Sequence, residues 1–246
     1  MRNVRGHGLS GPGAYKLALS LLGALLAAGQ PARAQLSAAA SLTSDYRLRG
    51  YSLSHREPAA SLTVGYDDKS GLFADATGVI LRQPNGDIGF LGGFATIGYA
   101  SRIRDNVALD IGLLRAQFAR QSSFGRDASY TELFAGVTGR ALSARAAFSP
   151  DYLRDGTATL YLSGEIVQRP APKWRIVGHA GFLATLRGGP PYPAPQTQYD
   201  WSVRVARQLG PADLELMYSN GGPNREFVDG VSRPKSALTG TARWAF

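Results

Sequence analysis

A two-residue alternation of apolar and polar side chains recurs along this chain and constrains its fold more than any other feature. Within residues 235–246, Leu238, Gly240, Ala242, Trp244 and Phe246 occupy every second position, and Thr239, Thr241 and Arg243 fall between them. Because successive side chains of a strand point to opposite faces, this spacing predicts a strand with one apolar face. The 30 glycines also argue against a helical protein, since glycine weakens a helix interior by about 1 kcal/mol.

The same alternation predicts twelve strands. The pattern is weakest in 88–100, where glycine and apolar residues occur on both faces, and in 130–138. Short turns such as 67–71 and 169–173 alternate with longer connections such as 50–57 and 120–128. An even number of strands with this order of connections is typical of an outer-membrane barrel. The fold class expected is therefore all-β, a transmembrane up-and-down antiparallel β-barrel of about twelve strands.

The polar faces of these segments decide between a membrane barrel and a soluble sandwich. A sandwich turns its apolar faces inward, whereas a membrane barrel turns them to lipid and encloses a polar lumen. Charged residues of both signs lie at the centres of the predicted strands rather than at loop tips, which favours the membrane barrel. These residues are Asp75, Asp110, Glu132, Arg145, Glu165, Arg175, Asp200, Arg204, Asp213, Glu215 and Arg243.

The two ends of the chain carry signals for export and assembly. The first 34 residues hold four basic residues and no acidic ones, a twelve-residue apolar run from Leu17 to Ala28, and the sequence Ala32-Arg33-Ala34. This is the three-part pattern of a cleaved signal peptide, so we expect a signal at 1–34 and a barrel at 35–246. The alternating C-terminal strand ends in Phe246, which looks like the C-terminal signal of bacterial outer-membrane proteins. We therefore expect the outer membrane as location and the barrel-assembly machinery as a partner.

Residues 44–52 read SDYRLRGYS. This segment, followed in order by Pro58-Ala59, Tyr66 and Ser70-Gly71-Leu72-Phe73, resembles the N-terminal motif of the TorF family of porin-like proteins, in which the motif closes the first strand. The resemblance is sharp over residues 44–76 and only architectural beyond them. It implies an exported outer-membrane barrel with a pore function, and it implies no solute and no catalytic residue.

Asp45, Arg47 and Arg49 are spaced to share one face if this motif is part of a strand. On the polar face they would form a charged patch at the mouth of the lumen, where such groups bias ion passage. The alternative is an Asp–Arg ladder that fixes the first strand to its neighbours. With His179, which falls on a polar face, Asp45 and Arg47 complete the candidate lumen and selectivity residues.

Composition excludes or weakens several other functions. The chain has no cysteine and no closely spaced histidine pair, so we expect neither a metal site nor a cofactor. Removal of the signal lowers the formal charge from +9 to +5, which weakens a nucleic-acid interpretation. A Ser, His and acid arrangement around His55 is conceivable, but it requires a geometry that sequence cannot supply. Lipid and lipopolysaccharide are expected partners, the latter through basic residues in the long connections: Arg49, Arg56, Arg82, Arg120, Arg126, Arg225 and Arg233.

These observations favour a channel, not an enzyme, for passive diffusion of small hydrophilic solutes or ions through a charge-lined lumen. Two alternatives stay open: a non-conducting structural, adhesion or ligand-binding barrel, and an outer-membrane hydrolase. A twelve-stranded barrel lies between the small barrels that side chains fill and the porins that hold an aqueous channel. A lumen blocked by arginine–carboxylate pairs would favour the non-conducting alternative.

Overall fold

The computed structural model describes residues 34–83, 85–189, 197–222, 226–228 and 231–246. The predicted signal peptide lies outside the described residues except for Ala34, which begins the first strand. No helix in the described part of the chain is long and apolar enough to cross a membrane.

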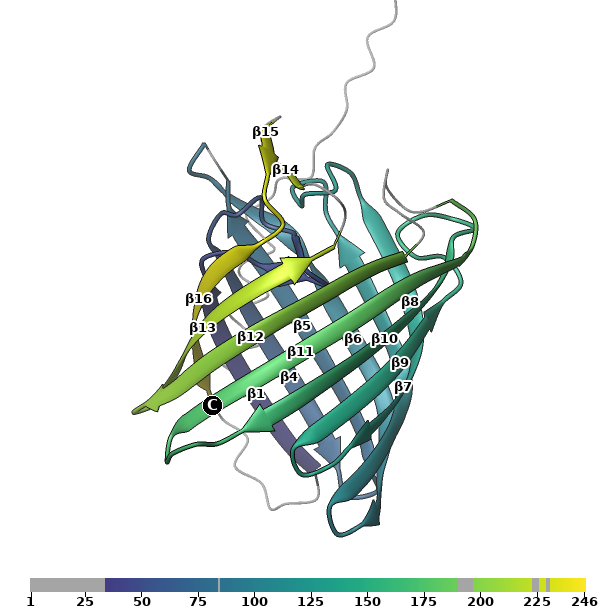
Figure 1. Cartoon of the computed structure of the whole chain (residues 1–246), viewed down its shortest axis with the longest axis vertical. Coiled ribbons are helices and arrows are strands. Elements are labelled where there is room, and N and C mark those ends of the chain that lie inside the picture. The colour runs from purple at the N-terminus through teal and green to yellow at the C-terminus, as the bar shows by residue number, and fades with distance from the viewer. Residues whose placement is uncertain (1–33, 84, 190–196, 223–225, 229–230) are drawn as a thin grey trace, which may run out of the picture. The chain divides into compact units, whose positions relative to one another are not determined.

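Twelve antiparallel strands close into one barrel, which confirms the predicted fold class and strand count (Figure 1). Each strand pairs with its neighbours in chain order, and β1 closes the ring against β16 from Ala39↔Ala245 to Thr43↔Thr241. The strands are β1 (Ala34–Thr43), β4 (Ala59–Asp68), β5 (Leu72–Arg82), β6 (Ile88–Arg104), β7 (Val107–Phe118), β8 (Ala128–Thr138), β9 (Leu142–Ser149), β10 (Ala158–Gln168), β11 (Trp174–Arg187), β12 (Thr197–Leu209), β13 (Ala212–Gly221) and β16 (Ala237–Ala245).

The connections differ in length at the two ends of the barrel, as the sequence predicts. The short turns lie at the lower end in Figure 1, which also holds the C-terminus, and the long connections lie at the upper end. We call these the short-turn end and the long-connection end. Two small hairpins belong to long connections: β2 (Arg47–Leu48) with β3 (Tyr51–Ser52), and β14 (Glu226–Val228) with β15 (Val231–Arg233).

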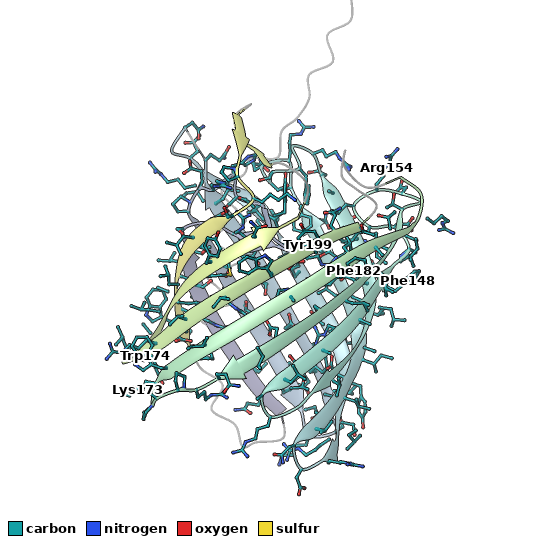
Figure 2. The ribbon with its side chains drawn as sticks, in the orientation of Figure 1. Phe148, Arg154, Lys173, Trp174, Phe182 and Tyr199 are labelled. Carbon is teal, nitrogen blue, oxygen red and sulfur yellow. The ribbon has the colours of Figure 1, made fainter. Side chains whose placement is uncertain are left out.

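The outer face of the wall is apolar. Large apolar side chains such as Ile97, Leu142 and Leu238 are more than half exposed on it. Figure 2 shows Phe148, Phe182 and Tyr199 on this outer face, with Lys173 and Trp174 at the short-turn end. A closed ladder with an apolar outer surface satisfies the backbone and suits hydrocarbon rather than water.

The connection between β1 and β4 does not lie outside the barrel. Its residues 44–58, which we call the inner segment, contact inward-facing side chains of several strands. Leu53 and Ser54 are only 1% and 0% exposed. The lumen of this barrel is therefore partly filled by its own first connection.

The inner segment overturns the prediction that Asp45, Arg47 and Arg49 share one face of the first strand. Strand β1 ends at Thr43, and the motif that was expected to close it forms the β2–β3 hairpin instead. Positive φ angles at Arg49 (49°) and Gly50 (75°) make a tight turn that an extended strand cannot contain. Arg49, expected in an external loop, is buried in the lumen.

Candidate functional site: the barrel lumen and its inner segment

Asp45 organises the base of the inner segment. Its carboxylate accepts hydrogen bonds from the hydroxyls of Ser52 (2.6 Å) and Ser54 (3.2 Å) and from Nη1 of Arg47 (2.7 Å). Asp45 is 6% exposed, so these charge-assisted bonds replace the water that it loses. The hydroxyl of Ser54 also accepts the backbone N–H of Tyr46 at 2.9 Å. These bonds fold the segment back on itself before it crosses the lumen.

Arg49 lies in a pocket of aromatic rings and one carboxylate. Its Nη2 donates to both carboxylate oxygens of Glu132 on β8, at 2.7 and 2.8 Å. Its Cζ lies 4.0 Å from the ring centre of Tyr161, 5.1 Å from that of Tyr152 and 5.8 Å from that of Tyr130. Guanidinium groups are attracted to aromatic faces at such distances. We call the four side chains of Tyr130, Glu132, Tyr152 and Tyr161 the cation pocket.

The cation pocket keeps Arg49 charged. Burial works against the charged form, but the interactions with its neighbours, the Glu132 carboxylate among them, outweigh burial, so the pKa of Arg49 lies above its ordinary value. Burial also raises the pKa of Tyr152, whose phenol therefore stays neutral at ordinary pH. The interaction is thus one of a permanent cation with a carboxylate and aromatic rings.

The tip of the hairpin reaches the opposite part of the wall. A Cβ added at Gly50 would lie 2.7 Å from the carbonyl carbon of Gly221 on β13 and 3.0 Å from Cβ of Asp200 on β12. At the same end, Nη2 of Arg47 donates to the backbone carbonyl of Lys235 at 3.1 Å, and Arg56 donates to that of Pro234. The inner segment therefore spans from its attachment at β1 to β8 and to the β12–β13 wall.

Apolar packing holds the rest of the segment. Leu53 is buried in a cluster with inward-facing side chains of β5 to β8, and Tyr46 and Tyr51 pack against the same cluster. Tyr46 stacks on Phe94 with 6.4 Å between ring centres, and Tyr51 stacks on Phe124 at 5.9 Å. The other buried members from the wall include Val79, Leu81, Leu91, Phe118, Tyr130 and Phe134.

Toward the short-turn end the lumen is lined by charges that pair across one intervening strand. Arg145 bonds Asp110 at 2.9 Å, Arg175 bonds Asp213 at 2.6 Å, and Arg204 bonds Glu165. His179 lies between Asp200 (Nε2 to Oδ1, 3.0 Å) and Glu165 (Nδ1 to Oε1, 3.6 Å), and the Tyr161 hydroxyl joins this group 3.1 Å from Asp200. Arg243, Glu215 and Asp75 have no ion pair among the described residues.

These side chains border several cavities, of which two concern the lumen between the strands. The first, of about 450 Å³, is lined by Tyr46 and Arg47 of the inner segment and by hydroxyl-bearing side chains of β1, β4, β5 and β16. Its charged lining consists of Arg47, Arg175, Arg204, Arg243, Asp213 and Glu215. The second, of about 320 Å³, lies between Asp110, Arg145, Glu165 and His179. Both cavities are polar and large enough to hold water or a small hydrophilic solute.

The structure places each predicted lumen residue on a surface that faces the barrel interior, by two different routes. The strand residues Asp75, Asp110, Glu132, Arg145, Glu165, Arg175, His179, Asp200, Arg204, Asp213, Glu215 and Arg243 alternate with the exposed apolar positions of their strands. Asp45 and Arg47 reach the lumen through the inner segment. Glu132 and Asp200 contact the inner segment and do not line either of these two cavities, so they belong to the wall surface on which the segment packs.

Sequence reasoning missed the cation pocket and the apolar half of the lumen. The signal was present: strands such as β6 and β8, which alternate poorly, carry apolar residues on both faces because their inner faces pack against the inner segment. Leu91 and Phe118, each 0% exposed on an inward face, have no role in an empty aqueous pore.

His55, the other histidine among residues 34–246, lies in the inner segment. The backbone N–H of His55 donates to the hydroxyl of Ser123 at 3.1 Å, and the nearby Ser52 and Ser54 hydroxyls bond Asp45. The two serine hydroxyls therefore stabilise the β2–β3 hairpin. Among the described contacts, no imidazole bonds either hydroxyl, as activation of a nucleophilic serine would require.

Comparison with known proteins places the fold. The NanC porin structure superposes with a TM-score of 0.55 at 11% identity, covering 86% of this chain and 98% of that one. The KdgM porin superposes at 0.54 and 8% identity, covering 85% and 99%, and a structure titled KdgM porin in complex with disordered oligogalacturonate superposes at 0.51 and 7%, covering 86% and 98%. At these identities the likeness shows the fold, which is that of outer-membrane porins.

A search of curated protein sequences found no match. A family model described as "Bacterial protein of unknown function (Gcw_chp)" matches residues 27–243, which is nearly the whole barrel. The chain therefore belongs to the Gcw_chp family of bacterial proteins.

Proposed function

We propose that this protein is an outer-membrane channel for diffusion of small hydrophilic solutes, and that its inner segment narrows the lumen. The observation that carries the proposal is the cavity of about 450 Å³ beside that segment, lined by charges of both signs inside a closed barrel. An apolar outer face with a charged interior is the arrangement by which porins pass polar solutes through a membrane.

Several other observations support this proposal. The structural relatives titled NanC and KdgM are porins, and one KdgM structure is titled as a complex with disordered oligogalacturonate. The cavity lining includes four arginines against two carboxylates. Arg47, Arg175 and Arg204 pair with Asp45, Asp213 and Glu165, whereas Arg243 and Glu215 have no ion pair among the described residues. We infer that anions enter this cavity more readily than cations. The resemblance to the TorF family agrees with a channel function.

The rest of the proposal concerns location and assembly. The N-terminal pattern directs export, and the protein then inserts into the outer membrane with its short turns in the periplasm. Phe246 is 74% exposed at that end, while its backbone N–H bonds the carbonyl of Ala38 at 2.8 Å. The side chain is thus free for the barrel-assembly machinery. The apolar wall contacts lipid, and basic residues of the long connections contact lipopolysaccharide.

Single-channel recording in planar bilayers tests the channel. The barrel purified from outer membranes should give discrete conductance steps that favour anions, and Arg204→Glu or Arg243→Glu should shift the selectivity toward cations. Arg207→Glu is the matched control, because Arg207 lies on the outer face, 5.1 Å from the Trp174 ring centre. Equal selectivity in all four proteins would refute lumen control by these arginines.

A second candidate, a non-conducting ligand-binding barrel, is favoured by the inner segment itself. The segment contacts β8, β12 and β13 and buries Leu53 and Ser54 almost completely. A folded protein that never conducts, even when the segment is released, would favour this candidate over the channel.

A further inference from the structure

The pocket around Arg49 has the composition of a binding site for an organic cation. It offers three tyrosine rings within 5.8 Å of the guanidinium carbon and a carboxylate that accepts two bonds. Aromatic faces combined with a carboxylate are the groups that recognise guanidinium and ammonium ligands. In this barrel the cation comes from the chain itself.

The wall builds the cation pocket without help from the inner segment. Tyr130 and Glu132 project from β8, Tyr161 from β10, and Tyr152 from the connection between β9 and β10. Tyr130 and Tyr152 pack together with 4.7 Å between ring centres, and the Tyr161 hydroxyl lies 3.1 Å from Asp200. Three of the four side chains stand on strands of the closed barrel, so we expect the pocket to persist when Arg49 leaves.

Arg49 fits this pocket incompletely. Its Nη1 is buried without a hydrogen-bond partner, although buried donors are normally satisfied. Its backbone has a φ of 49°, in the left-handed region that costs energy for a residue with a Cβ. A free cation carries no such backbone constraint, so it can orient its donors where the tethered side chain cannot.

We propose that Tyr130, Glu132, Tyr152 and Tyr161 form a binding site for small organic cations of the guanidinium class, which Arg49 occupies as a tethered competitor. A soluble guanidinium compound that takes this site displaces Arg49 and releases the inner segment from the lumen wall. This goes beyond diffusion through the channel, because it assigns a ligand to the wall and couples that ligand to the segment.

The first test removes the competitor and supplies a free replacement. Arg49→Ala takes away the side chain beyond Cβ, and ethylguanidinium restores the missing group; ethylurea is its neutral counterpart of similar shape. Ligand-detected NMR on the folded barrel should show ethylguanidinium binding at least tenfold more tightly to Arg49→Ala than ethylurea does. Adding Glu132→Gln should remove that preference, because the carboxylate is lost. Equal binding of the two compounds would overturn the proposal.

The second test uses the unmodified protein and so does not depend on the folding of a variant. The inner segment contains chymotrypsin sites at Tyr46, Leu48, Tyr51 and Leu53, which are buried or half-buried. Chymotrypsin does not recognise guanidinium groups. Cleavage within residues 46–53 should therefore rise at least tenfold with ethylguanidinium and stay at the basal rate with ethylurea. The same rate with both compounds would overturn the proposal, and neither test requires the barrel to conduct.

Discussion

Replacing Glu132 with glutamine should release the inner segment while leaving the barrel folded. Glu132 is 3% exposed and gives Arg49 its charged partner. Glutamine keeps the shape and one acceptor oxygen, but it leaves the guanidinium buried without a counter-charge. Removing one partner of a buried ion pair typically costs about 3–5 kcal/mol.

The lost ion pair destabilises the packed segment, so the variant shifts toward a folded barrel with a released segment and not toward an unfolded barrel. The contacts of Arg49 with three tyrosines are the same in the unmodified protein and the variant, so they cancel in the comparison. The glutamine oxygen still accepts a bond from the guanidinium, which recovers about 2 kcal/mol of the loss. A remaining loss of about 1–3 kcal/mol shifts the balance between the bound and released segment by about ten- to a hundredfold. The wall keeps every strand pairing, including the β1–β16 closure, because no wall bond involves the Glu132 carboxylate.

Two measurements follow the release in Glu132→Gln. The rate of chymotrypsin cleavage within residues 46–53 should rise about ten- to a hundredfold, and bilayer recordings should show a larger or more frequent open state. Heat-modifiable migration on gels verifies that the barrel is folded. Asp110→Asn is the matched control: it removes a lumen carboxylate whose partner Arg145 is 48% exposed, a pair worth about 0–1 kcal/mol. If both variants resemble the unmodified protein, Glu132 does not hold the segment.

Three further outcomes are expected. Burial raises the pKa of Tyr46 to about 12, above its ordinary 10.0. The neutral phenol therefore stabilises the packed segment by up to about 3 kcal/mol, a contribution that is complete below pH 10 and lost as the pH rises through 12. Absorbance at 295 nm and cleavage of the segment should change together at that pH, and Tyr46→Phe should abolish the change in cleavage. Gly50→Ala should loosen the segment by about 1–3 kcal/mol, since the φ of 75° is strained for a residue with a Cβ and the added Cβ would lie 2.7 Å from the carbonyl carbon of Gly221, as cleavage rates would show. Deleting Phe246 should lower the amount of barrel in outer membranes without altering the stability of purified protein by more than about 1 kcal/mol.

The wall of this barrel was predictable because its rule is local. Side chains of each strand alternate between the lipid-facing and the lumen-facing side of the wall, so apolar and polar residues alternate with a period of two. Each strand shows this pattern independently of the others. The faces of β11 and β16 follow directly from this rule, as do the positions of Arg175, Arg204 and Arg243. Which charges pair was not predictable, because Arg204 with Glu165 depends on registers set by two hairpins.

The inner segment was not predictable by the same rule. Asp45, Arg47 and Arg49 have strand spacing, but the spacing continues through a turn that Gly50 makes tight. Nothing local shows that Arg49 bonds Glu132, which lies 83 positions further along the chain. The usable signal was indirect: the poor alternation of residues 88–100 and 130–138 indicated inner faces that contact something other than water.

The size of the barrel explains why the first connection folds inward. A ring of twelve strands is too wide for its own side chains to fill, yet narrow enough for one hairpin to bridge. The chain divides the lumen by chemistry. Apolar inner-face residues, most of them on β5 to β8, pack against Leu53 and its neighbours, while charged residues of β7, β9 to β13 and β16 border the cavities. Arg49 sits where these two halves meet, since Glu132 lies on β8 and Tyr161 on β10. On our proposal, displacing this one side chain loosens the segment and uncovers the apolar half, so its pocket, rather than the wider cavities, is the point at which a ligand would act on the segment.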